Sequence, residues 1–182
     1  MRLFIAIDLN GAMRREVGTV LSALRERACG GRFEPLENTH VTLRFLGESN
    51  DLAGAVAAMH EACRGIHPFT LRLGSYGCFL KGNGSRGSGR TSYLNVEGDL
   101  DELGILHETL ESALYDRGFS RDQKHFVPHI TLGRNVEHDE LVGLELADIK
   151  PVAEMTVTEL TLFESTRIKG RMVYTPLHRE SF

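Results

Sequence analysis

The sequence has few cysteines, no long apolar segment and no excess of positive charge. Its cysteines, Cys29, Cys63 and Cys78, are odd in number and form no C-x-x-C pair, so neither a disulfide framework nor a zinc knuckle is expected. No uncharged run approaches the ~20 residues that a membrane span requires. Because the formal net charge is −4, the whole surface offers no general attraction to nucleic acid, and a polyanion would have to meet local basic residues.

The composition that remains is ordinary for a globular protein. The 182 residues are 41% hydrophobic and 25% charged, which fits one domain spanning residues 1–182, or two small lobes that share one core. The apolar run that begins at Leu3 resembles the start of a signal peptide, but Asp8 ends it short of the ~7–15 residues that such a segment needs. We therefore expect a cytoplasmic protein with no membrane partner.

Hydrophobic periodicity predicts a mixed α/β chain with much antiparallel pairing. Strand-like segments cover residues 2–9, 41–46, 69–80, 93–96, 130–132, 155–163 and 173–177. Helical spacing covers 13–28, 52–63 after an N-cap at Asn50 or Asp51, and 100–118. Between two strands, Lys81–Arg90 holds glycines and cations without an acid, which predicts a loop that is either a solvated tether or a grip on RNA backbone.

One tetrad occurs twice. His40-Val41-Thr42-Leu43 is repeated as His129-Ile130-Thr131-Leu132, and each copy lies on a predicted strand that follows a loop. With this composition, roughly 0.07 copies of H-x-T-L are expected by chance, so two copies point to a common cause. Since side chains at i and i+2 of a strand share a face, each copy presents one imidazole and one hydroxyl to the same surface.

Two such strands side by side would suit phosphoryl transfer. In-line displacement at phosphorus needs a base on the attacking oxygen and an acid on the leaving oxygen, and histidine serves in either role near neutral pH. The hydroxyls of Thr42 and Thr131 can donate to the non-bridging phosphate oxygens, where negative charge accumulates. A 2′,3′-cyclic ribose phosphate is an attractive substrate because it is strained and needs neither a metal nor ATP.

The tetrads and their surroundings resemble a known family. The resemblance is carried by four segments, at residues 4–9, 37–47, 126–134 and 160–165. In order and content they are similar to the RNA 2′,3′-cyclic phosphodiesterases, also called 2′-5′ RNA ligases, of the two-histidine phosphoesterase superfamily. Two features depart from the family pattern: the Lys81–Arg90 loop replaces a short apolar connection, and Gly133 stands where alanine is commoner.

The resemblance implies a fold, an activity and a set of site residues. The fold is a bilobal, pseudo-two-fold duplicated α+β architecture, with mostly antiparallel sheets lining a central cleft and helices outside. The activity is hydrolysis of a 2′,3′-cyclic phosphate to a 2′-phosphomonoester without cofactor or metal, with reversible 2′-5′ RNA joining as a side activity. It also implies that His40 acts as the acid and His129 as the base, and it favours a phosphate-binding role for Arg134.

The expected partners are RNA with 2′,3′-cyclic phosphate ends, tRNA fragments included, or cyclic nucleotides, bound by a monomer. Three alternatives stay open: a hydrolase that uses His40 and His129 as metal ligands, a non-catalytic module that binds RNA ends, and an enzyme for another cyclic or 2′-5′-linked phosphate. Against the first, no H-x-x-x-H or HEXXH pattern accompanies the two histidines.

The strand pattern also bears on three neighbouring side chains. Strict alternation from His129 puts Arg134 on the far face, unless a bulge at Gly133 turns it back. Arg44 shares the parity of His40 and is interpreted as a solvated charge at the rim. Phe126 either stacks on a base or packs in the core.

Overall fold

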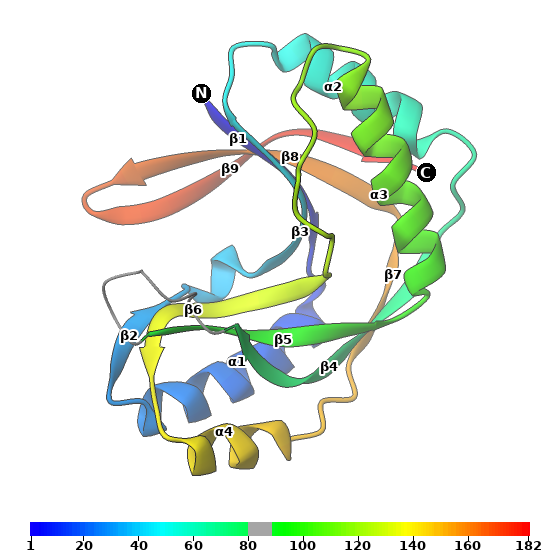
Figure 1. Cartoon of the computed structure of the whole chain (residues 1–182). Helices are drawn as coiled ribbons and strands as arrows, with labels where there is room; N and C mark the ends of the chain where they lie inside the picture. Colours follow the sequence, from blue (N-terminus) through cyan, green and yellow to red (C-terminus); the bar gives the residue numbers. More distant parts are fainter. Residues whose placement is uncertain (80–88) are drawn as a thin grey trace.

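The computed structural model describes residues 1–79 and 89–182 (Figure 1). The predicted Lys81–Arg90 loop therefore lies mostly outside the described residues. Its last residue, Arg90, is described and begins a strand, so the predicted loop extended one residue too far.

Helices and strands alternate largely as predicted. The helices are α1 (Gly11–Arg27), α2 (Leu52–Cys63), α3 (Leu100–Tyr115) and α4 (Glu140–Ala147), and η1 (Leu36–Asn38) is a short 3-10 turn. The strands are β1 (Arg2–Asp8), β2 (Gly30–Phe33), β3 (His40–Glu48), β4 (Phe69–Phe79), β5 (Arg90–Gly98), β6 (His129–Glu137), β7 (Glu154–Val157), β8 (Glu159–Ile168) and β9 (Arg171–Ser181). The single strand predicted over residues 155–163 is wrong, because the chain leaves β7 and enters β8 at Thr158. Helix α4 and strand β2 were not predicted.

The strands form one antiparallel sheet whose order is symmetric about its centre. The order is β7-β4-β5-β6-β3-β1-β8-β9, with β2 paired to β6 off this path. The two H-x-T-L strands, β3 and β6, are neighbours at the middle, and Val41 of β3 pairs with Ile130 of β6. On the outer side of β3 lies β1, and on the outer side of β6 lies β5. This arrangement is the pseudo-two-fold α+β duplication that the resemblance implied.

The helices cover the outside of the curved sheet in two pairs. Helices α2 and α3 pack together, with α2 against β8 and β9, whereas α1 and α4 cover the half that contains β4 and β7 (Figure 1). Each pair therefore combines one helix from the first half of the chain with one from the second. Among the described residues, no helix has the length and apolar character of a membrane span.

Strand β1 shows why its sequence is almost wholly apolar. Leu3, Ile5 and Ile7 belong to the main core between sheet and helices, whereas Phe4 packs on the opposite face against Phe163 and Tyr174. Because both faces are covered, all five residues from 3 to 7 are at most 2% exposed. Phe4, Ala6 and Phe163, with Tyr174 packed against them, form a second, smaller apolar cluster beneath His40.

Candidate active site

The two tetrad histidines are held by the same local device. Nδ1–H of His40 donates to the carbonyl of Asn38 at 2.6 Å, and Nδ1–H of His129 donates to the carbonyl of Val127 at 2.7 Å. In each case the acceptor lies two residues earlier, in the segment that enters the strand. A ring whose Nδ1 donates to a carbonyl is left with Nε2 as the nitrogen that can exchange a proton with a substrate.

Aromatic rings surround both imidazoles. His40 lies 4.9 Å from Phe4 and 5.5 Å from Tyr174 between ring centroids, and His129 lies 5.4 Å from Phe79 and 5.5 Å from Tyr93. These rings come from the other strands of the same half of the sheet, so each histidine is fixed in orientation by its own half.

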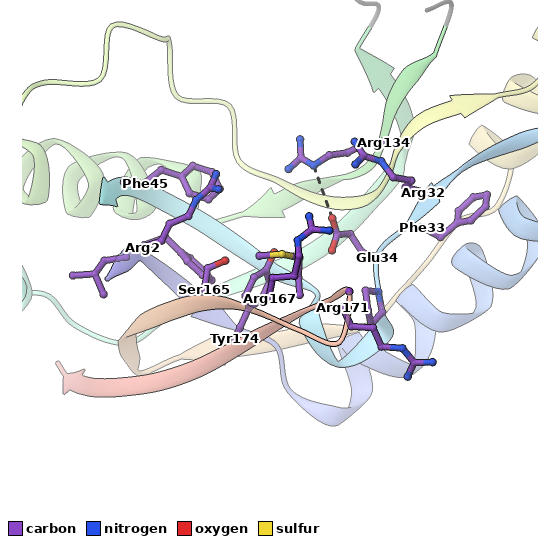
Figure 2. Close-up of a pocket in the computed structure, with 16 residues that line it drawn as sticks. Arg2, Arg32, Phe33, Glu34, Phe45, Arg134, Ser165, Arg167, Arg171 and Tyr174 are labelled. Atoms are coloured by element: carbon purple, nitrogen blue, oxygen red, sulfur yellow. Dashed lines mark ion pairs between the residues drawn. The ribbon is translucent and has the colours of Figure 1, made fainter. Parts of the chain in front are cut away.

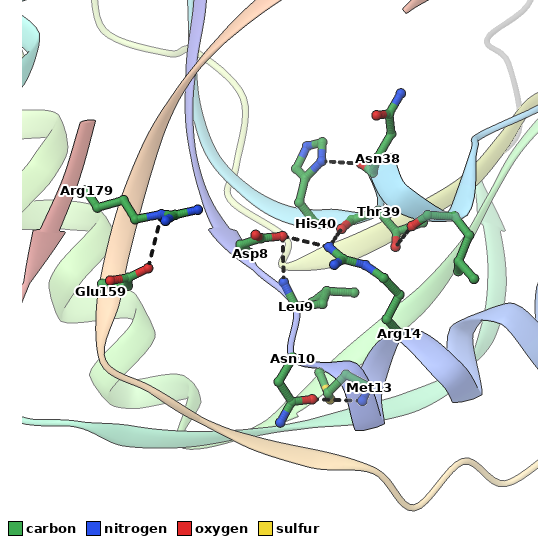
Figure 3. A network of polar contacts seen from close by, with 11 residues as sticks. Asp8, Leu9, Asn10, Met13, Arg14, Asn38, Thr39, His40, Glu159 and Arg179 are labelled. Atoms are coloured by element: carbon green, nitrogen blue, oxygen red, sulfur yellow. Dashed lines mark hydrogen bonds and ion pairs between the residues drawn. The ribbon is translucent and has the colours of Figure 1, made fainter. Parts of the chain in front are cut away.

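The two halves differ at the residue paired with each histidine. Asp8 of β1 pairs with His40, whereas Asn95 of β5 pairs with His129. Oδ1 of Asp8 accepts a hydrogen bond from Nη2 of Arg14 at 2.7 Å (Figure 3). A carboxylate favours a protonated imidazole and a neutral amide does not. This difference was not predicted, because it depends on the register of β1 and β5.

Burial dominates the protonation of His40. It lowers the pKa of His40 to about 4, while the bond to the Asn38 carbonyl and the charge of Asp8 act in the opposite direction. The charge of Arg134, and that of His129 when it is protonated, lower this pKa further. His40 and His129 lie on adjacent strands at the centre of the sheet, because Val41 pairs with Ile130.

The two predicted threonines follow the histidines on the same strands. Oγ1 of Thr42 lies 2.8 Å from Nε2 of His40, so with a neutral imidazole the hydroxyl donates to that nitrogen. Thr131 of β6 pairs with Tyr93 of β5. Both threonines are partly exposed.

The same bulge occurs in both tetrad strands. In the pairing of β1 with β3, Leu43 is an extra residue between Thr42 and Arg44. In the pairing of β5 with β6, Leu132 is the extra residue between Thr131 and Gly133. A bulge reverses the facing of the side chains that follow it, as far as the next irregularity in the pairing, so strict alternation from the histidine fails here.

The two bulges explain the directions in which Arg44 and Arg134 point. Arg44 turns inward and is 7% exposed, so the interpretation as a solvated rim charge is wrong. Arg134 turns toward the site, as predicted for a bulge near Gly133, and its side chain is half exposed with Nε 3.9 Å from Oε1 of Glu34. Phe126 packs against the core and stacks on His107 with ring centroids 4.0 Å apart, which is the second of its two interpretations.

A cleft of about 700 Å³ opens on the side of His40, and the residues that line it include neither the histidines nor the threonines of the tetrads. Phe4 and Tyr174, which contact His40, line it together with Phe45 and Arg134 (Figure 2). Its cationic lining consists of Arg2, Arg32, Arg134, Arg167 and Arg171. Glu34 is the acidic residue among the lining residues, and burial raises its pKa. A chain of net charge −4 therefore gathers arginines where an anion can enter.

Most of these arginines were not predicted as site residues because they are distant in sequence. Arg2 belongs to β1, Arg32 to β2, and Arg167 and Arg171 to the hairpin of β8 and β9. They meet only because β2 pairs with β6 and β8 with β1. A second cavity of about 150 Å³ shares Tyr174 with this cleft and is lined by His40 and Asp8.

The fold is a duplicated α+β sheet with two H-x-T-L strands at its centre. The Nδ1 atoms of both histidines are fixed by hydrogen bonds, and an arginine-lined cleft lies next to His40. Together these features define a two-histidine phosphoesterase architecture. The model of the 2′-5′ RNA ligase superfamily matches residues 14–168, and the chain belongs to that family.

Individual relatives agree with the family match. An RNA 2′,3′-cyclic phosphodiesterase of Thermotoga maritima is 32% identical, over 100% of this chain and 96% of its own length. Among solved structures, TT0787 of Thermus thermophilus is 27% identical with a TM-score of 0.78, covering 100% of this chain and 97% of its own. LigT of Escherichia coli in complex with 3′-AMP is 31% identical with a TM-score of 0.76, covering 99% and 97%. The resemblance stated from the sequence is confirmed.

Proposed function

We propose that this protein hydrolyses the 2′,3′-cyclic phosphate end of RNA to a 2′-phosphomonoester, with His40 and His129 as the acid and base. The observation that carries the proposal is the matched pair of imidazoles on adjacent strands, each with Nδ1 engaged by the carbonyl two residues earlier. The relatives named RNA 2′,3′-cyclic phosphodiesterase support the same activity. We also propose that residues 1–182 act as one domain, since both tetrads are needed for one site.

The reaction needs two proton transfers and no redox change. Nε2 of His129 takes a proton from water as the water oxygen bonds to phosphorus, the bond from phosphorus to O3′ breaks, and Nε2 of His40 gives a proton to that oxygen. Thr42 and Thr131 donate to the non-bridging oxygens, and the guanidinium of Arg134 offsets their charge. The product carries its phosphate on O2′. The same steps, with the 5′-hydroxyl of a second RNA in place of water, would form a 2′-5′ bond as the bond from phosphorus to O3′ breaks.

The division of roles follows from the pair Asp8 and Asn95. The pKa of about 4 leaves His40 neutral at pH 7, which taken alone would favour a base. A bound phosphate brings a further negative charge against His40 and raises this pKa when substrate binds, in addition to the charge of Asp8 on the paired strand, which already acts on His40 without substrate. His129 is paired with the uncharged Asn95 and lacks that support. His40 is therefore proposed to become charged with substrate and to act as the acid.

The cleft favours an RNA strand over a free nucleotide. Its arginines extend along the hairpin of β8 and β9, beyond the region of the tetrads, and suit further phosphates of a chain. Phe45 is 54% exposed and lines the cleft, so its ring offers a surface on which a base can stack. For an RNA end, Phe45 thus offers a surface for a base and Arg134 a partner for the reacting phosphate. Arg167 and Arg171 of the β8–β9 hairpin form a basic track for further phosphates.

The experiment that tests this function uses a short RNA with a 2′,3′-cyclic phosphate, incubated with the protein in EDTA, and identifies the position of the product phosphate. We expect multiple turnovers to a 2′-phosphate, loss of activity in His40→Ala and His129→Ala, and no loss in His67→Ala, whose side chain is exposed. Binding without turnover would support an RNA-end binding module instead. Activity that is lost in EDTA and restored by a divalent ion would contradict the two-histidine mechanism.

A further inference from the structure

Arg44 is a buried charge that the proposed reaction does not use. It lies in β3, shortly after His40 and Thr42, and the bulge at Leu43 turns it to the core side of the sheet. Its side chain is 8% exposed, and that of Glu111 is 9% exposed. Nε of Arg44 and Oε1 of Glu111 lie 2.6 Å apart, as a buried ion pair between β3 and α3.

The rest of the guanidinium contacts the segment that leads into β6, and Nη1 also donates to the carbonyl of Phe45 in β3 at 3.1 Å. Nη2 of Arg44 donates to the carbonyl of Ser120, and Nη1 lies 3.7 Å from Oδ2 of Asp122. Oε2 of Glu111 accepts a hydrogen bond from the backbone N–H of Asp122 at 3.3 Å. The ion pair thus holds both the backbone and a side chain of this segment.

The same segment positions His129. Residues 116–128 connect α3 to β6, and the carbonyl of Val127 near their end accepts the Nδ1–H of His129. Just before it, Phe126 stacks on His107 of α3. The connection is therefore fixed to α3 at two places, and the first of them depends on a side chain from the strand of His40.

Within residues 1–79 and 89–182, the second tetrad strand has no equivalent of this arginine. The residue that corresponds to Arg44 is Gly133, which also follows the bulge. A Cβ there would come within 2.8 Å of Val136 Cγ2 and 3.0 Å of the Arg32 carbonyl, because β2 occupies that space. The pseudo-symmetry is broken so that the first tetrad strand supports the second histidine, without the reverse support from Gly133.

We propose that Arg44, through Glu111 and the 116–128 connection, is a positioning residue that aligns His129 with the site. The proposal rests on the proposed function for its kinetic consequences but not for its structural ones. Arginine suits this role better than lysine, because its planar fork reaches a carboxylate and a carbonyl at once.

The test compares Arg44→Lys, Arg44→Gln and Glu111→Gln with a matched control, Arg117→Gln. Arg117 belongs to the same connection, but its ion pair reaches Glu61 of α2, with Nη2 and Oε2 2.8 Å apart, and not β3. For each variant we would measure the melting temperature, kcat and KM on a 2′,3′-cyclic mononucleotide, and the NMR titration of both imidazoles.

We expect the Arg44 and Glu111 variants to lose roughly 10- to 100-fold in kcat with little change in KM, as for a catalytic group that is misplaced. The imidazole of His129 should shift its resonances and its titration, while His40 stays unchanged. The Arg117 control should leave both unchanged. If Arg44→Gln does not fold, Arg44→Lys keeps the buried charge and still loses the fork.

Double variants separate positioning from general destabilisation. In a His129→Ala background, Arg44→Lys should cost no further rate, whereas in a His40→Ala background it should cost its full factor. Equal losses in both backgrounds, or a His129 titration that does not move, would overturn the proposal. The NMR measurement needs no turnover. If the chain had no phosphodiesterase activity, the proposed function would be wrong, but the NMR titration of His129 would still test whether Arg44 positions that residue.

Discussion

Phe45 and Arg134 occupy equivalent positions in the two tetrad strands. Each lies five residues after its histidine, each follows a bulge at the leucine of the tetrad, and both line the same cleft (Figure 2). The duplication has therefore placed an aromatic ring on one side of the site and a guanidinium on the other. Under the proposed function, this asymmetry gives the cleft a direction, in which a base binds on the side of β3 and a phosphate on the side of β6.

Replacement of Phe45 should change KM, whereas replacement of Arg134 should change kcat. Loss of a stacked base costs about 1–3 kcal/mol, so Phe45→Ala should raise KM for an RNA end roughly 10-fold and leave kcat nearly unchanged. Phe45→Tyr keeps the platform and serves as the control. Arg134→Gln should lower kcat instead, because charge on the non-bridging oxygens grows in the transition state. Steady-state kinetics on a cyclic-ended dinucleotide would decide, and a kcat defect in Phe45→Ala would contradict the assignment.

The arginines of the β8 and β9 hairpin should matter only for longer substrates. Arg167→Gln and Arg171→Gln remove charges from the basic track without touching the tetrads. Each should weaken the binding of an RNA of several nucleotides and reduce the slope of log KM against log salt by about 1 for each phosphate that the variant no longer neutralises. Rates on a cyclic mononucleotide should not change. If the mononucleotide suffers as much as the RNA, the track does not extend along the chain as proposed.

The central features of the site could be predicted from the sequence because they are local. Side chains two residues apart on a strand share one face, and this places His40 with Thr42 and His129 with Thr131 without knowledge of the fold. The long helices were predicted for a similar reason, since α1 buries an apolar stripe that includes Met13. Helix α4 was missed because it buries one residue, Leu146, while Leu141 and Leu144 are both 63% exposed.

The remaining features depend on pairing between distant segments. The inward turn of Arg44 requires the bulge at Leu43, which exists only in the register of β3 against β1. The choice of Asp8 as the neighbour of His40 depends on the same register. The short strand β2, Gly30–Phe33, has no alternation of its own and is defined by its pairing with β6.

The free energy of unfolding of the protein should fall as the pH drops from about 6.5 to about 4. Because burial lowers the pKa of His40 to about 4, the folded state binds fewer protons than the unfolded state in this window, and unfolding is favoured as pH decreases. The full effect, reached below pH 4, is at most about 3 kcal/mol, since one pKa unit corresponds to ~1.4 kcal/mol. Urea unfolding at several pH values would show a shallower decline for His40→Asn. Parallel curves for the two proteins would show that His40 does not titrate this way.

The acid role of His40 should depend on Asp8. Removal of the carboxylate lowers the pKa of His40 in the substrate complex, so the alkaline limb of the bell-shaped kcat profile should move to lower pH in Asp8→Asn, and the acid limb should stay. At neutral pH the rate should fall roughly 10-fold for each unit of this shift. Arg14, which loses its partner in this variant, is controlled by Arg14→Gln. The reciprocal change, Asn95→Asp, should move the acid limb instead, because it charges the residue paired with His129.

A substrate whose leaving group departs without a proton separates the two histidines directly. On the natural cyclic phosphate, His40→Ala and His129→Ala should each lose about 10²–10⁴-fold in rate, the contribution of a positioned acid or base, and a threonine replacement should cost less. On an activated phosphodiester the acid is no longer needed, so His40→Ala should recover much of its rate. His129→Ala should remain slow, because water must still be deprotonated. The reverse pattern would show that the two roles are exchanged and that Asp8 supports a base, and equal defects on both substrates would contradict any division of labour between His40 and His129.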